Sequence, residues 1–191
     1  MENHKSVNSE MPEPIQPQPS GAGLISGFIG TAKAVILSPR VFFPAMPIEG
    51  GLLGPYVFFL LCTFLYLVVS VVLNVGSARS LDPRFFLMIL VALAMPFLSA
   101  LLLYTFLAKL WRTGASYEAT FRVVCYASAV NLVSWIPILG IFFQFYEIYL
   151  STLGLSIVHR TTMGRALLAV VATALTLFLA VFMSVQSFFI P

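Results

Sequence analysis

Charged residues are scarce in this 191-residue chain. They make up 9% of it, and 60% of the chain is hydrophobic, whereas about a quarter of a soluble domain is charged. Residues 55–75, 85–108 and 166–191 contain no Asp, Glu, Lys or Arg. Each run reaches the roughly 20 residues that a helix needs to cross a bilayer, and backbone in lipid must satisfy its own hydrogen bonds. The shortage of charge excludes a soluble domain and predicts an all-α, polytopic membrane bundle.

Catalytic and metal-binding motifs are missing as well. Cys62 and Cys125 are far apart in sequence, and His4 and His159 stand alone, so no spacing typical of a metal site occurs. The chain has no HExxH, GxSxG or Walker sequence. Its basic residues flank the apolar runs, where membrane topology and lipid headgroups account for them. We therefore expect no enzyme, no cofactor, no metal and no nucleic-acid partner.

Residues 119–158 admit two interpretations. Either two spans are joined by a tight turn at 136–141, near Pro137 and Gly140, or one span covers 123–143 and residues 148–158 lie flat on the membrane. With two spans the chain has five transmembrane helices, an N-terminus in the cytoplasm and a C-terminus outside. Only Arg79 and Arg84 then lie outside, which agrees with the positive-inside rule better than the four-span arrangement does. The basic residues on the inside are Lys5, Lys33, Arg40, Lys109, Arg112, Arg122, Arg160 and Arg165.

Composition divides the chain into three parts. Residues 1–20 are rich in Pro, Glu, Gln and Ser, and we expect a disordered cytoplasmic tail there. The tail lacks the apolar core of a secretory signal peptide, so we expect the first apolar span to insert uncleaved. Residues 21–54 predict an interfacial amphipathic helix over 21–37, ended by Ser38-Pro39, and then an irregular segment leading into the first span. Residues 55–191 form the five-span membrane domain.

One acidic residue, Glu147, falls well inside a predicted span. An ionisable group at such a depth is costly and is by default a candidate functional site. Gln144, Glu147 and Ser151 recur at helical spacing, which places them on one face of the fourth span and predicts that this face points into the bundle. The spacing indicates a polar cluster, and it leaves open whether Glu147 couples a proton or substrate or simply joins two helices.

The hairpin suggests which residues complete this polar cluster. If the chain turns near Pro137, Glu147 lies level with the neighbourhood of Val130 on the preceding span. Asn131 is then the expected hydrogen-bond partner of Glu147, with Tyr126 within about two turns. Arg122 would lie roughly 12 Å deeper toward the cytoplasm, so a direct ion pair would need strong helix tilt or snorkelling. The candidate intramembrane polar cluster is Gln144, Glu147, Asn131, Tyr126 and Ser151.

Two stretches resemble the Yip family of Ypt/Rab-interacting-protein membrane domains, in its bacterial branch. One is SPRVFFPAMPIEGGLLGP at 38–55. The other is YASAVNLVSWIPILG at 126–140 followed by YEIYLSTLGLSIVHRTTMGRA at 146–166. The similarity covers about residues 33–190. One departure is visible, since Val130 stands where family members often have a proline after the Tyr-Ala-Ser run.

The resemblance implies five spans with a cytoplasmic N-terminus and offers no catalytic or cofactor residues to carry over. Eukaryotic relatives are associated with Rab-type GTPases, membrane trafficking and organelle shape. The leading hypothesis is a non-enzymatic, multi-pass protein of the bacterial inner membrane that organises membrane partners or the bilayer, in contact with lipids and other membrane proteins. The alternative is a small transporter or channel subunit that uses the Gln144, Glu147 and Asn131 cluster. The sequence leaves a homo-oligomer open.

Overall fold

The computed structural model describes residues 23–73 and 83–189, and every regular element in those ranges is a helix. The first half of the chain forms α1 (Gly23–Leu37), α2 (Pro39–Ala45), α3 (Leu53–Leu73) and α4 (Pro83–Trp111). The second half forms α5 (Tyr117–Ala127), the 3-10 helix η1 (Ser128–Leu132), α6 (Pro137–Val158) and α7 (Met163–Phe189). The predicted all-α class is confirmed, and the predicted tail at 1–20 lies outside the described residues.

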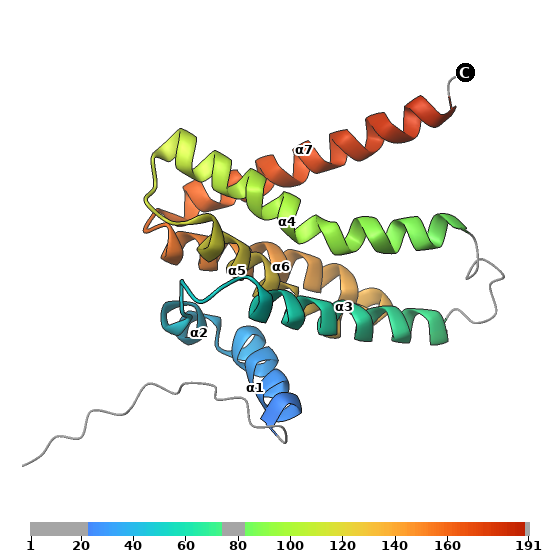
Figure 1. Ribbon diagram of the computed structural model, residues 1–191, viewed down its shortest axis with the longest axis horizontal. Coiled ribbons are helices and arrows are strands. Elements are labelled where there is room, and N and C mark those ends of the chain that lie inside the picture. The colour runs from blue at the N-terminus through green and yellow to red at the C-terminus, as the bar shows by residue number, and fades with distance from the viewer. Residues whose placement is uncertain (1–22, 74–82, 190–191) are drawn as a thin grey trace, which may run out of the picture.

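Four of the described helices are long and apolar enough to cross a membrane. They are Leu53–Leu73, Ile89–Trp111, Leu139–Val158 and Met163–Ala180. The pair Ile25–Leu37 and Pro39–Ala45 would make a fifth by length and composition, but it is bent by 118°. In Figure 1, α3 and α7 run one way along the bundle while α4 and α6 run the other way. The chain is thus a polytopic membrane bundle, and the side of the membrane that each end faces stays a prediction.

The segment from α5 to α6 makes the hairpin that the two-span interpretation requires. α6 is one continuous helix of 22 residues that is long and apolar enough to span a membrane, which favours the two-span interpretation over a flat segment at 148–158. The turn comes slightly earlier than predicted, because Pro137 fits the first turn of α6, where its missing N–H costs no hydrogen bond. Gly140 lies against the turn, and a Cβ at this position would collide with the carbonyl oxygen of Ser134.

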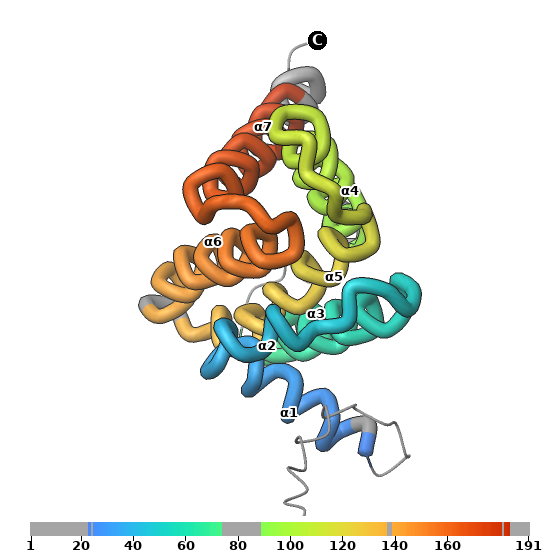
Figure 2. Tube along the Cα trace, turned by 90° about the vertical axis from the view of Figure 1, so that its left-hand side faces the viewer, coloured from blue at the N-terminus to red at the C-terminus, as the bar shows by residue number. Residues whose placement is uncertain are grey.

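α5 and η1 occupy the centre of the bundle, as Figure 2 shows, with α3, α4 and α6 around α5. The 11 residues of α5 and the five of η1 are shorter than the helices around them and are mostly buried. The chain changes from an α-helix to a 3-10 helix at Ser128. The hydroxyl of Ser128 donates to the carbonyl of Cys125 at 2.6 Å, and such a side-chain hydrogen bond competes with the backbone hydrogen bonds of an α-helix. The segment of α5 and η1, which we predicted to be the third span and which is not among the candidate spans, is therefore broken before Val130, although it contains no proline.

α2 corrects the prediction for residues 38–54, which we expected to be irregular. Pro39 lies in the first turn of α2, and a proline there is compatible with a helix. α2 brings Phe43 into the core, where its ring is fully buried. Phe43 lies so close to Gly154 of α6 that a Cβ on Gly154 would come within 2.8 Å of the ring. The two segments α1 and α2 are thus part of the folded bundle at one of its ends.

Candidate functional site

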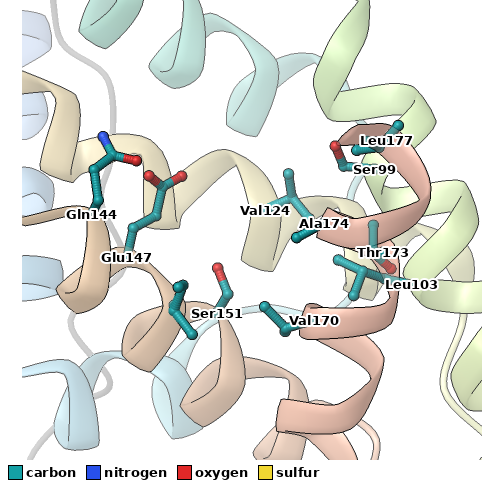
Figure 3. Close-up of a pocket in the computed structure, with 11 residues that line it drawn as sticks. Ser99, Leu103, Val124, Gln144, Glu147, Ser151, Val170, Thr173, Ala174 and Leu177 are labelled. Atoms are coloured by element: carbon teal, nitrogen blue, oxygen red, sulfur yellow. The ribbon is translucent and has the colours of Figure 1, made fainter. Parts of the chain in front are cut away.

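A pocket of about 320 Å³ opens beside the middle of α6, bordered also by α4, α5 and α7. In Figure 3, Gln144, Glu147 and Ser151 come from α6, and Ser99 of α4 and Thr173 of α7 lie on the opposite wall. Val124 and Val170 contribute to the apolar surface between these two walls. The three polar residues that the helical spacing placed on one face of α6 do share one face, and that face lines a cavity.

The other two predicted members of the cluster lie elsewhere. The ring of Tyr126 packs against Phe42 and Phe58, with centroids 5.2 Å apart in both pairs. Asn131 lies on η1 and is absent from the pocket lining. Within the described ranges, no hydrogen bond joins Asn131 to Glu147. The expected position of Asn131 holds for an uninterrupted α-helix. A 3-10 helix rises about 2.0 Å per residue and turns about 120°, so both the level and the direction of Asn131 differ from the expectation.

Glu147 and Thr173 are the chemically notable groups in this pocket. Glu147 is partly buried, and no hydrogen bond or ion pair to its carboxylate occurs in the described part of the chain. Thr173 is 4% exposed, and its hydroxyl oxygen has no partner in the described structure. No group of three His, Cys, Asp or Glu residues that could hold a metal is present among the described residues. The pocket can accept hydrogen bonds and attract a cation, but it offers no nucleophile paired with a base.

A second polar cluster, which the sequence argument missed, lies at the charged end of the bundle. Arg122 is 4% exposed and forms an ion pair with Glu118, one helical turn earlier, at 3.0 Å. Its guanidinium also donates to the carbonyls of Pro47 at 3.1 Å and Gly51 at 2.8 Å. Glu118 in turn accepts from the backbone N–H of Gly51 at 2.6 Å. The Glu-x-x-x-Arg spacing in the sequence was a usable signal for this i,i+4 pair.

This arrangement fixes the chain between α2 and α3. Gly50 and Gly51 have φ values of 121° and 89°, which are conformations that favour glycine. Arg122 and Glu118 satisfy the backbone groups of that turn from the side of α5. Arg122 is therefore occupied at this end of the bundle and, in the described structure, pairs with Glu118 rather than Glu147.

His159 joins two loops at the same end. Thr120 donates its hydroxyl proton to the carbonyl of Ser116 at 3.1 Å, so it must accept from Nε2 of His159, which lies 2.8 Å away. Nδ1 then accepts from the hydroxyl of Thr113 at 2.7 Å. The hydrogen bond to Thr120 places a proton on Nε2, and in the neutral ring Nδ1 is then the acceptor. Burial lowers the pKa of His159 from 6.5 to about 4, which agrees with a neutral ring.

The neutral state of His159 predicts a pH dependence of stability. Between about pH 6.5 and pH 4 the unfolded chain binds a proton that the folded chain does not, so stability is complete above this range and decreases as the pH falls through it. We expect the free energy of unfolding to drop by about 1–3 kcal/mol from neutral pH to about pH 4. The test is the unfolding temperature of the wild type and of His159→Asn at both pH values. An equal acid loss in the two proteins would contradict the assignment.

An all-α bundle with several apolar spans defines an integral, multi-pass membrane protein. Its sequence matches the profile of the Yip1 domain over residues 33–185, which is most of the chain, and the chain therefore belongs to the Yip1 domain family. No curated protein and no solved structure matches it.

The two stretches on which the resemblance rests contact each other in the structure. Phe43 lies against Gly154, and the side chain of Arg40 donates to the hydroxyl of Tyr149 at 3.4 Å. Tyr146 donates to the carbonyl of Ile36, near the end of α1, at 2.6 Å. These contacts connect α1 and α2 to α6.

Proposed function

We propose that this protein is a non-enzymatic component of the bacterial inner membrane that organises membrane partners or the bilayer through α1 and α2. The supporting observation is that the bundle buries part of these two helices and leaves other apolar residues on them exposed. Phe43 is buried in the core, whereas Ile25, Leu37 and Val41 are 74%, 75% and 72% exposed. A short apolar helix attached to the end of a bundle suits the interface between lipid and water.

The basic residues near this surface support a position at the cytoplasmic face. Lys33 and Arg40 are both exposed on α1 and α2. Cationic side chains beside an apolar helix strengthen its attraction to the anionic lipids of the cytoplasmic leaflet. Figure 1 shows α1 pointing away from the direction of the long helices rather than along it, as an interfacial helix would. The exposed apolar residues Ile25, Leu37 and Val41 make up what we call the outer face of this segment.

Site-specific photo-crosslinking in native membranes tests the proposal. A photoreactive residue at Ile25 or Val41, on the outer face, is expected to give discrete protein adducts or adducts with lipid headgroups. The matched control is Phe178, which is 66% exposed on α7 and is expected to give adducts with acyl chains. If Ile25, Val41 and Phe178 all give the same acyl-chain pattern, the outer face does not act as an interaction surface.

A second function, a small transporter or channel subunit, is favoured by one observation. Glu147 faces a cavity at the middle of a candidate span and has no partner in the described residues, and such groups often mark a substrate pathway. Solute flux into proteoliposomes containing wild type or Glu147→Gln separates the two functions. Background flux in both proteins would remove the transporter function, and flux that depends on Glu147 would remove the purely organising one.

A further inference from the structure

The pocket beside α6 has two polar ends separated by an apolar middle. Figure 3 shows Glu147 and Gln144 at one end and Ser99 and Thr173 at the other, with Val124 and Val170 between them. A volume of about 320 Å³ is at the lower end of the range of small-molecule sites. This shape fits a short molecule that is apolar in its middle and polar at both ends.

Hydrogen-bonding capacity is unsatisfied at both ends of the pocket. The carboxylate of Glu147 has no partner among the described residues, and the buried hydroxyl of Thr173 has none either. At the depth of a span, water does not compensate such groups as it would at a protein surface, and a carboxyl group facing hydrocarbon is costly. An occupant that brings a cationic donor to Glu147 would remove this cost.

A second copy of this chain is poorly suited to bring that donor. Apart from Arg122, the Lys and Arg residues lie in the tail, in α1 and α2, or near the ends and connections of the long helices. The spans Leu53–Leu73 and Leu139–Val158 contain none. Arg122 lies on the central helix but is already occupied by Glu118 and two carbonyls. A small cation is therefore the better match for the carboxylate.

We propose that this pocket binds a compact organic ammonium ion. The ammonium group donates to the carboxylate of Glu147 and to the side-chain oxygens of Gln144 or Ser151. The apolar body of the ligand lies against Val124 and Val170, and a distal hydroxyl or carbonyl meets Thr173 and Ser99. The inference concerns binding alone, does not depend on α1 or α2, and holds whether or not the molecule is moved across the membrane.

Ligand-dependent thermal stabilisation of the purified protein tests this site. The probe is 6-amino-1-hexanol, and its neutral match is 1,6-hexanediol, which differs only in replacing the amine with a hydroxyl. We expect the amine to raise the unfolding temperature of the wild type in a saturable way, as binding to the folded state requires, and the diol to leave it unchanged. Glu147→Gln should weaken the apparent affinity for the amine about tenfold or more, because it removes the charge-assisted hydrogen bond.

Two further measurements keep the result interpretable. Glu147→Gln breaks no interaction among the described residues and removes an unpaired charge, so without probe it should unfold at the wild-type temperature or above it. Thr173→Val provides a second variant with weakened binding that keeps the carboxylate. Equal stabilisation by amine and diol, equal stabilisation of wild type and Glu147→Gln, or no stabilisation at all would overturn the proposal. A wild-type dimer that Glu147→Gln converts to a monomer would overturn it in favour of self-association. The crosslinking at the outer face is unaffected by any of these outcomes.

Discussion

Replacing Arg122 with methionine is expected to lower the free energy of unfolding by about 2–4 kcal/mol. The change removes the ion pair to Glu118 and the donors to the carbonyls of Pro47 and Gly51. Glu118 is only 28% exposed, so its carboxylate would be left largely desolvated beside a turn that has lost its anchor. Leaving one member of a partly buried pair without its partner costs more than the pair itself contributes. Steric trapping in bicelles or a thermal unfolding series in detergent measures the loss.

The control for this prediction is Arg165→Met, at an exposed position near the start of α7. We expect a change within about 0.5 kcal/mol there. The double variant Glu118→Gln with Arg122→Met should recover part of the stability, because no unpaired charge remains. A loss in Arg122→Met no greater than that in Arg165→Met would show that the cluster does not hold the chain between α2 and α3.

Adding a side chain at Gly154 is expected to separate α2 from α6. A Cβ would come within 2.6 Å of Cγ1 of Val123 and within 2.8 and 2.9 Å of two ring carbons of Phe43. Val123 and Phe43 are fully buried, so neither side chain has free space into which to move. Overpacking of this kind costs about 1–3 kcal/mol, and the better helix propensity of alanine offsets up to about 1 kcal/mol. We expect a net loss for Gly154→Ala and a loss of at least about 3 kcal/mol for Gly154→Leu.

Gly164 is the matched control, since a Cβ at this exposed helical position would meet nothing within 4 Å. Gly164→Ala should leave stability unchanged or raise it by up to about 1 kcal/mol. The two alanine variants should therefore differ in sign in the same thermal unfolding assay. Equal effects at both positions would show that Phe43 is not fixed against α6.

The parts of the fold that could be predicted are those set by local composition. A long apolar run without charge has few alternatives to a membrane helix, so α3, α4 and α7 follow from the sequence. The count of flanking basic residues also selected the hairpin of α5 and α6. α2 was missed because Pro39 and Pro44 suggest a break, although a proline in the first turn is compatible with a helix. The burial of Phe43, which depends on packing against α6, stabilises that short helix.

The residues of the candidate site also separate into those that local sequence predicts and those that it does not. Gln144, Glu147 and Ser151 belong to one continuous helix, and helical spacing alone places them together. Asn131 was assigned across a turn and through η1, where a change of winding alters both level and direction. Ser99 and Thr173 come from α4 and α7, which no local pattern could bring to the same pocket. Positions within one helix therefore follow from the spacing, whereas positions that depend on η1, α4 and α7 require the packing of the bundle.

The central claim is that the chain from α5 to α6 crosses the bilayer and returns. Cysteine accessibility tests it directly, because Cys62 and Cys125 are both buried and give a low background. Single cysteines at Gly114 and Thr162 should react with an impermeant maleimide from the cytoplasmic side only. A cysteine at Trp135, which is 39% exposed in the turn before α6, should react only from the opposite side. Labelling of position 135 from the same side as position 114 would contradict the account.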